Sequence, residues 1–360
     1  MLTRALNQNR VAWVGYVAAA VVLIVLPFAV DHLLGRAWVR VIDVALLYIM
    51  LALGLNIVVG FAGLLDLGYI AFFAVGAYTY ALLASPQFDI HLSFLLVLPL
   101  GALVAAVFGV LLGAPTLKLR GDYLAIVTLG FGEIIRIFLN NLNRPINITN
   151  GPLGITLIDP VSLGGVSLSK TQTLAGLTFS AVHSYYYLFL MCVLLSVYIN
   201  LRLEDSRVGR AWIAIREDEA AAKAMGINAR NVKLLAFAMG ATFGGVAGGL
   251  FASFQGFISP ESFTLLDSIM VLCMVVLGGM GNVAGVVLGA VLLTALPEAL
   301  RYVGPIQQEW FGRVWVDASE LRMLLFGLAL VAMMLFRPAG LWPSRIRKRE
   351  FATARQKPPL

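Results

Sequence analysis

Ten long apolar runs occupy most of this chain, and they decide what it can fold into. They cover residues 11–30, 44–59, 70–83, 92–112, 123–139, 185–199, 234–251, 265–277, 283–300 and 323–336. A helix needs about 20 apolar residues to cross the hydrocarbon core of a bilayer. The alternating ten-residue segments of a membrane β-barrel do not occur in the sequence. The chain, which is 60% hydrophobic and 12% charged, is therefore predicted to be an all-α integral membrane protein with about ten transmembrane helices.

The first run superficially resembles a secretory signal, because Arg4 and Arg10 precede it. A signal has an apolar region of about 7–15 residues followed by a cleavage site of small residues. The run over 11–30 is longer than that, and no such site follows it. We therefore expect it to be retained as the first transmembrane helix.

Basic residues predict the orientation of the chain, because cytoplasmic loops carry an excess of Lys and Arg. With both termini inside, 18 of the 26 basic residues fall in inner segments and seven in outer segments, and Arg136 lies within a run. The expected topology is N-in and C-in, which places residues 202–233 in the cytoplasm. The outer loop over 140–183 is long for a connector, so we expect it to receive a partner outside the membrane.

We expect a transmembrane domain over residues 1–343 and a basic cytoplasmic tail over 344–360. From residue 337 to 357 there are seven basic residues and one acidic residue, Glu350. This charge suits anionic lipid headgroups, and a plain orientation signal explains it equally well. Nucleic-acid binding is disfavoured, because no folded basic domain accompanies the charge.

A charged, alanine-rich segment over residues 216–226 separates two apolar runs. Acidic residues at its start suit the positive end of a helix, Lys223 follows Glu219 by four residues, and a glycine stands where a left-handed stop is expected. We predict a short surface helix whose flat face docks into a cleft on a soluble partner. An ordinary amphipathic connector would explain the helix ends but not the flat face. The candidate docking residues are Glu217, Asp218, Glu219, Ala220, Ala221, Ala222 and Gly226.

Glu133 and Arg136 are charged residues within an apolar run. Counting from Leu124, Glu133 lies roughly 14 Å into the run, near the middle of a core of about 30 Å. Arg136 follows three positions later, on the same helix face. Charges at this depth are expensive and face a partner or a cavity. The pair is therefore either a structural ion pair or part of a transport pathway.

Two glycine-rich segments share a local pattern, over residues 58–63 and 276–281. Their candidate hinge glycines are Gly60, Gly63, Gly278 and Gly281. Glycine interruptions in corresponding places point to pathways in transporters, although close helix packing explains them equally well. The turn over residues 61–68 could be re-entrant or a simple loop.

The chain offers no enzymatic or metal-binding motif. Residues 164–171 imitate a phosphate-binding loop but have Ser169 where glycine must precede the lysine, and residues 279–284 imitate a dinucleotide motif between two apolar helices. Cys192 and Cys273 lie in apolar runs, and the three histidines lack ligand spacing. We expect no cofactor, no metal and no catalytic residue, so energy for uphill transport must come from another chain.

The sequence resembles the LivM-type permeases of branched-chain amino acid ABC importers from about residue 44 to 343. The segments that carry the resemblance are GLLDLGYIAF at 63–72, GAY at 76–78, LRGDYLAIVTLGFGEIIR at 119–136, GRAW at 209–212, REDE at 216–219, QGFISPESF at 255–263, the glycine turn at 276–281 and RPAGLW at 337–342. Their order and spacing are far more specific than shared hydrophobicity.

The resemblance implies a type II-like importer permease in a bacterial inner membrane. Its implied partners are a homologous permease of the LivH type, two cytoplasmic ATPase subunits and an extracytoplasmic binding protein, besides membrane lipid. The alanine-rich segment then corresponds to the coupling helix that docks on the ATPase. The general importer pattern places glycine where Met225 stands, with Gly226 one residue later, and the downstream Ile-x-Leu-Pro is missing.

Three other functions compete with import of leucine, isoleucine and valine. A permease for urea or another small polar solute belongs to the same family, and the residues do not distinguish these substrates. An ion-coupled secondary transporter or channel needs ion ligands near the midplane, and the sequence offers only Glu133 and Arg136 there. A membrane enzyme needs a nucleophile or metal cluster, and none is present.

Overall fold

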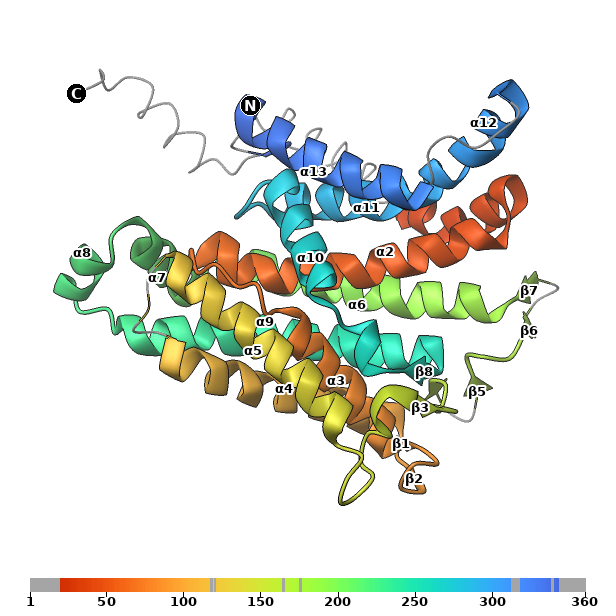
Figure 1. Cartoon of the computed structure of the whole chain (residues 1–360), viewed down its shortest axis with the longest axis horizontal. Helices are drawn as coiled ribbons and strands as arrows, with labels where there is room; N and C mark the ends of the chain where they lie inside the picture. Colours follow the sequence, from red (N-terminus) through yellow and green to blue (C-terminus); the bar gives the residue numbers. More distant parts are fainter. Residues whose placement is uncertain are drawn as a thin grey trace, which may run out of the picture.

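The computed structural model describes residues 20–116, 119, 121–163, 166–174, 177–311, 318–337 and 340–342. The described residues form a bundle of helices (Figure 1). The helices are Ala20–Leu34, α2 Arg36–Leu55, the π-helix η1 Asn56–Phe61, α3 Ile70–Leu83, α4 Phe94–Thr116, α5 Asp122–Asn141, the 3₁₀ turn η2 Gly151–Leu153, α6 Ala181–Glu204, α7 Arg207–Glu217, α8 Glu219–Ala224, α9 Ala229–Gln255, the 3₁₀ turn η3 Pro260–Ser262, α10 Leu265–Gly278, α11 Val283–Arg301, α12 Val303–Phe311 and α13 Ala318–Phe336.

The helical membrane fold is confirmed. Every predicted apolar run coincides with a helix wherever the structure describes it. Among the described residues, six helical stretches are long and apolar enough to cross a membrane, namely Arg36–Phe61, Phe94–Thr116, Ala181–Glu204, Ala229–Gln255, Pro260–Gly278 and Val283–Arg301. The count of ten spans and the N-in, C-in orientation stay predictions. Residues 11–19, the domain boundary at 343 and the basic tail lie outside the described residues.

Helix α9 forms the centre of the bundle, where it packs against α2, α3 and α4. Small residues allow these backbones to approach closely. A Cβ atom on Gly76 of α3 would lie 2.2 Å from the carbonyl oxygen of Gly245 on α9, and a Cβ on Gly248 would lie 2.1 Å from the carbonyl oxygen of Phe73. Glycine is therefore required at this crossing, as in other membrane helix pairs that pack through small residues.

Helix α3 begins at Ile70, which is buried inside the bundle. Residues 62–69 run as a non-helical segment from the end of η1 to α3. The backbone N–H of Leu67 donates to Oγ1 of Thr128, midway along α5, at 3.0 Å. The N–H of Ile70 donates to Oγ of Ser268 near the start of α10, also at 3.0 Å. The segment at 61–68 is therefore hydrogen-bonded to α5 and leads into α3 beside α10, whereas the helical stretch before it, Arg36–Phe61, is by itself long enough to cross a membrane. The choice between a re-entrant segment and a simple loop stays a prediction.

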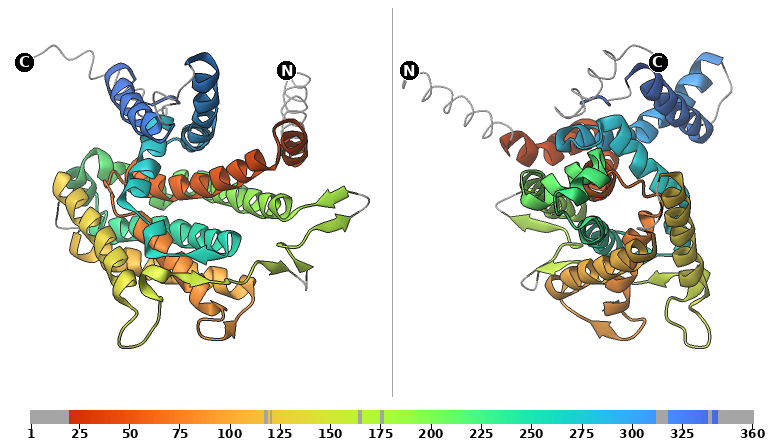
Figure 2. Two further views of the ribbon diagram at one scale, coloured as in Figure 1. Left: turned by 45° about the vertical axis from the view of Figure 1, so that its right-hand side comes forward. Right: turned by 90° about the vertical axis from the view of Figure 1, so that its left-hand side faces the viewer.

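Four short antiparallel strand pairs lie at one end of the bundle. They are β1 Ala84–Ser85 with β2 Ile90–His91, β3 Ile155–Thr156 with β8 Phe257–Ile258, β4 Ser162–Leu163 with β5 Val166–Ser167, and β6 Gln172–Leu174 with β7 Leu177–Phe179. Helices α7 and α8 lie at the opposite end (Figure 1; Figure 2, left). The loop predicted to be outside and the segment predicted to be cytoplasmic thus occupy opposite ends.

Candidate functional site

The predicted coupling segment is divided between two helices. Asp218 adopts an extended backbone conformation that ends α7 at Glu217. Its Oδ1 then accepts hydrogen bonds from the N–H groups of Ala220 and Ala221, at 2.8 and 3.1 Å, and so caps α8. Gly226 closes α8 with φ of +85°. The prediction of one helix that includes Glu217 is therefore wrong, because Asp218 caps a new, shorter helix over Glu219–Ala224.

Glu219 faces the protein and ties α8 to α9. Its Oε2 accepts from Nζ of Lys233 at 2.7 Å, and its Oε1 lies 2.9 Å from Nζ of Lys223. The two ammonium groups lower the pKa of Glu219 to about 2. Ala222 is also buried, against Ile215 and Ala229. These two residues therefore lie outside the flat face that the sequence predicted.

The exposed face of α8 is smaller than the predicted docking surface. Ala220, Ala221 and Ala224 are exposed, and the side chain of Met225 after the helix is 76% exposed. Met225 occupies the position where the general importer pattern has glycine, so this chain presents a flexible apolar side chain there. We call these four residues the α8 face.

The two glycine turns meet at the same end of the bundle as α8. Oδ1 of the fully buried Asn56 accepts a hydrogen bond from the N–H of Gly281 at 2.8 Å. A Cβ on Gly60 would lie 2.6 Å from that same nitrogen, so the turns touch through their backbones. Sequence reasoning missed Asn56, although a buried amide within the run 44–59 was a signal that could have identified it.

Arg216, from the end of α7, contacts both turns. Its Nη1 donates to the carbonyl oxygen of Gly60 at 2.6 Å. A Cβ on Gly63, where φ is +69°, would lie 2.4 Å from Cγ of Arg216, and one on Gly281 would lie 3.6 Å from its Nη1. Gly278 packs against the backbone of Gly285 on α11. The residues Phe61, Arg216 and Gly281 line a cavity of about 660 Å³ at this end.

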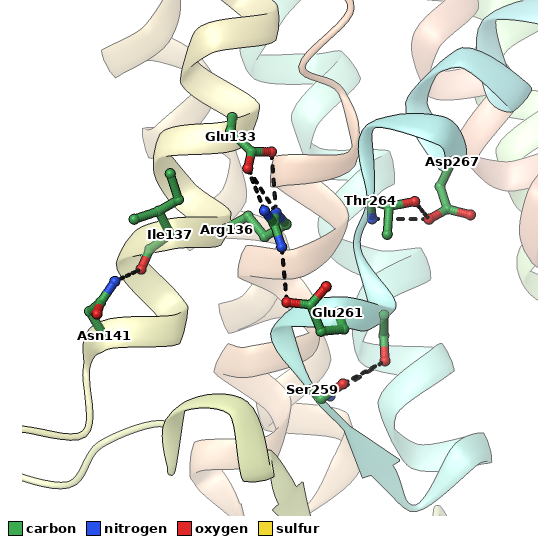
Figure 3. A network of polar contacts seen from close by, with 9 residues as sticks. Glu133, Arg136, Ile137, Asn141, Ser259, Glu261, Thr264 and Asp267 are labelled. Carbon is green, nitrogen blue, oxygen red and sulfur yellow. Dashed lines mark hydrogen bonds and ion pairs between the residues drawn. The ribbon is translucent and has the colours of Figure 1, made fainter.

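Glu133 and Arg136 contact each other and a third charged residue (Figure 3). Nε of Arg136 donates to both carboxylate oxygens of Glu133, at 3.1 and 3.2 Å. Its Nη1 donates to Oε1 of Glu261 on η3 at 2.9 Å. This contact was not identified from the sequence, because it joins segments 125 residues apart.

This charged cluster is partly exposed. The side chains of Glu133, Arg136 and Glu261 are 39%, 27% and 60% exposed. Glu133 also borders a cavity of about 120 Å³ between α5 and the starts of α3 and α10. The lining residues are Leu67, Ile70, Leu129, Gly132, Glu133, Phe263, Leu265 and Ser268. The cluster thus carries a net negative charge beside a mostly apolar cavity.

Two further acids accept local hydrogen bonds, Asp267 in the capping box of α10 and Asp66 in the turn before α3. Oδ2 of Asp267 accepts from the N–H and Oγ1 of Thr264 at the start of α10, at 3.0 and 2.7 Å. Oδ1 of the fully buried Asp66 accepts from the N–H of Gly68 at 2.9 Å. In the part of the chain that the structure describes, no group of three or more His, Cys, Asp or Glu residues is placed to hold a metal ion.

Comparison with known proteins identifies the family. The family model described as "Branched-chain amino acid transport system / permease component" matches residues 37–334. The chain belongs to this family. No solved structure matches it.

Curated relatives carry names that agree with this family. The permease protein LivM of the high-affinity branched-chain amino acid transport system in Escherichia coli is 45% identical over 90% of this chain and 74% of its own length. A probable branched-chain amino acid permease LivM of Methanocaldococcus jannaschii is 30% identical over 69% of each chain. LivH of Salmonella typhimurium, from the corresponding high-affinity system, is 27% identical over 82% of this chain and 90% of its own length.

Replacement of Glu219 by glutamine is expected to lower the free energy of local unfolding of α8 by about 1–2 kcal/mol. It removes a charged hydrogen bond whose strength is reduced by partial exposure to solvent. The folded pKa of Glu219, about 2, lies below its ordinary value of 4.5. The bonds therefore stabilise α8 above pH 4.5, and this stabilisation is lost as pH falls toward 2. Hydrogen exchange of the α8 amides measures the change.

Lys223→Gln is the matched control for Glu219→Gln. The Lys223 side chain is 54% exposed, whereas that of Lys233 is 9% exposed. We expect Lys233→Gln to accelerate exchange in α8 more than Lys223→Gln. Equal exchange in wild type and Glu219→Gln would contradict the assigned role of Glu219.

Arg136→Leu is expected to destabilise the protein more than Glu133→Leu. Loss of Arg136 leaves two carboxylates, Glu133 and Glu261, without their shared cation, whereas loss of Glu133 leaves Arg136 bound to Glu261. Each charged hydrogen bond contributes roughly 1.5–3 kcal/mol. Thermal denaturation in detergent measures the order of the two variants, and the reverse order would show that Glu261 does not share the arginine.

Proposed function

We propose that this chain is the permease subunit of an ATP-driven importer and that it forms, with a homologous LivH-type permease, the pathway for leucine, isoleucine and valine. The family match over residues 37–334 carries this proposal. The names of the LivM and LivH relatives support the substrate and the paired permeases. The six long apolar helices fit a multi-pass protein of the bacterial inner membrane. ATP hydrolysis then belongs to partner subunits.

The α8 face is the proposed docking surface for a cytoplasmic ATPase. Helix α8 lies at the edge of the bundle (Figure 1). Its buried side is fixed to α9 by the Glu219–Lys233 pair, so the helix is held firmly while its small alanines stay exposed. This arrangement suits insertion into a cleft on a partner. The N-in, C-in orientation that the basic residues predict would place this end in the cytoplasm, as the proposed docking requires.

The charged cluster of Glu133, Arg136 and Glu261 is proposed to border the translocation pathway. Partly exposed charges within a span are costly against lipid, so such residues face a partner or a water-filled cavity. Their exposure, together with the adjacent cavity, favours the pathway over a purely structural ion pair. The same contact also fixes η3 against α5, so both roles are served by one cluster.

The outer loop over 140–183 is the proposed receiving surface for the binding protein. Its strand β3 pairs with β8, which links the loop to the segment that carries Glu261. The N–H of Asp159 also donates to the carbonyl oxygen of Ala84 at 2.7 Å. A protein that binds this loop from outside can therefore displace both α3 and η3 through it.

Uptake into proteoliposomes tests the proposed function. The chain, a LivH-type permease, the ATPases and the binding protein are reconstituted together, and uptake of leucine, isoleucine, valine and urea is compared. We expect ATP-dependent uptake of the three amino acids that requires the binding protein. Preferential urea uptake would assign the alternative substrate, and uptake without ATP but with an ion gradient would assign a secondary transporter.

Ala221→Trp is expected to reduce the amount of ATPase that co-purifies by about tenfold or more. The indole would overpack a close interface at the flat α8 face. Leu92→Trp, at an exposed position near β2 at the opposite end, is the control. Both variants should insert into membranes like wild type. If Ala221→Trp recovers a normal amount of ATPase, α8 is not part of the docking surface.

A further inference from the structure

Arg216 connects the α8 face to the two glycine turns. It is the last residue but one of α7, and only the Asp218 cap separates that helix from α8. Its side chain leaves this cytoplasmic surface and enters the bundle, where 19% of it stays exposed. No other contact described above joins the coupling segment directly to the glycine turns.

The backbone around Gly60 leaves its carbonyl oxygen available to Arg216. Gly60 lies in η1, a π-helix in which the regular ladder of α-helical hydrogen bonds is altered. Its carbonyl oxygen accepts from Arg216, and a Cβ on Gly281 would lie 3.3 Å from that same oxygen. The guanidinium group thus contacts the point where the turns touch, and the Asn56–Gly281 bond holds the second turn to the first.

The aliphatic part of Arg216 also fixes the first turn. The backbone of Gly63 packs directly against Cγ and Cδ of this side chain. A displacement of α7 along the bundle therefore pushes or pulls the backbone at both Gly60 and Gly63. Lysine could place one charge near Gly60, but it lacks the planar fork that holds a carbonyl in a fixed direction.

We propose that Arg216 is a strut that transmits displacement of α8 to the paired glycine turns, so that movement at the ATPase opens the pathway at this end. The strut rests on the proposed docking of the ATPase at α8. Arg216 acts through the turns and does not itself touch substrate, so it is a positioning residue. The chemistry it requires is a carbonyl acceptor at Gly60 and a glycine at position 63.

The first test measures amino acid transported per ATP hydrolysed in the reconstituted complex. For Arg216→Ala we expect a drop of about fivefold or more, the range of a typical coupling between sites, with a smaller drop for Arg216→Lys. ATPase association and basal hydrolysis should stay as in wild type. Arg210→Ala is the matched control, because Arg210 lies in the same helix and also donates to a backbone carbonyl, that of Asp205, but this bond is local.

Each outcome separates the strut from the docking proposal. Normal transport per ATP in Arg216→Ala overturns the strut, and so does loss of ATPase association, which would place Arg216 in the docking surface itself. A merely structural role would lower stability without changing transport per ATP. Failure of the docking proposal has a different signature, namely normal ATPase recovery with Ala221→Trp.

A distance measurement covers the case in which Arg216→Ala fails to fold. Spin labels are placed on Arg207→Cys, an exposed position at the start of α7 outside the α8 face, and on Met280→Cys, in a chain whose Cys192 and Cys273 are replaced by serine. With Arg216 present, we expect the distance between labels to be unchanged when ATP is trapped on the complex, because both labelled segments move together. With Arg216→Lys we expect the distance to change. A change of equal size in both chains would overturn the strut.

Discussion

Backbone hydrogen bonding inside the membrane is the constraint on which the rest of this structure depends. An N–H or carbonyl group in hydrocarbon has no water to bind, so irregular backbone is tolerated only where protein groups satisfy it. Between η1 and α3, side chains of a neighbouring helix and of the segment itself satisfy backbone N–H groups, and α10 binds the first N–H of α3. Thr128 accepts from Leu67, Asp66 accepts from Gly68, and Ser268 accepts from Ile70. These bonds satisfy irregular backbone between η1 and α3.

The sequence predicted the helices because their information is local. An apolar run of sufficient length is enough to specify a membrane helix, and α3 matches its predicted range of 70–83 to the residue. The capping of α10 by Thr264 and Asp267 is local too, since three residues separate the partners. Such features depend on spacing along the chain, which a single sequence displays.

Contacts between distant segments could not be predicted in the same way. Glu261 pairs with Arg136 from 125 residues away, and Asn56 binds Gly281 from 225 residues away. Glu219 was assigned to the docking face because its buried partner, Lys233, belongs to the next helix and looks like an ordinary cytoplasmic charge in the sequence. In each case the polar or charged residue is visible in the sequence, but its partner is determined by the packing of the whole bundle.

The segments around the two glycine turns are joined at two levels. Near the α8 end, Asn56 binds Gly281, and inside the bundle Ile70 binds Ser268. Between these contacts runs α10, whose 14 residues form a rod of roughly 21 Å. A rod held at both ends transmits a displacement with little loss, because packed helices are not continuously deformable. Movement of the glycine turns would therefore displace the start of α10, which borders the same cavity as Glu133. With the proposed docking at α8 and the proposed role of Arg216, the α8 face, the turns and the charged cluster would form successive contacts along one path.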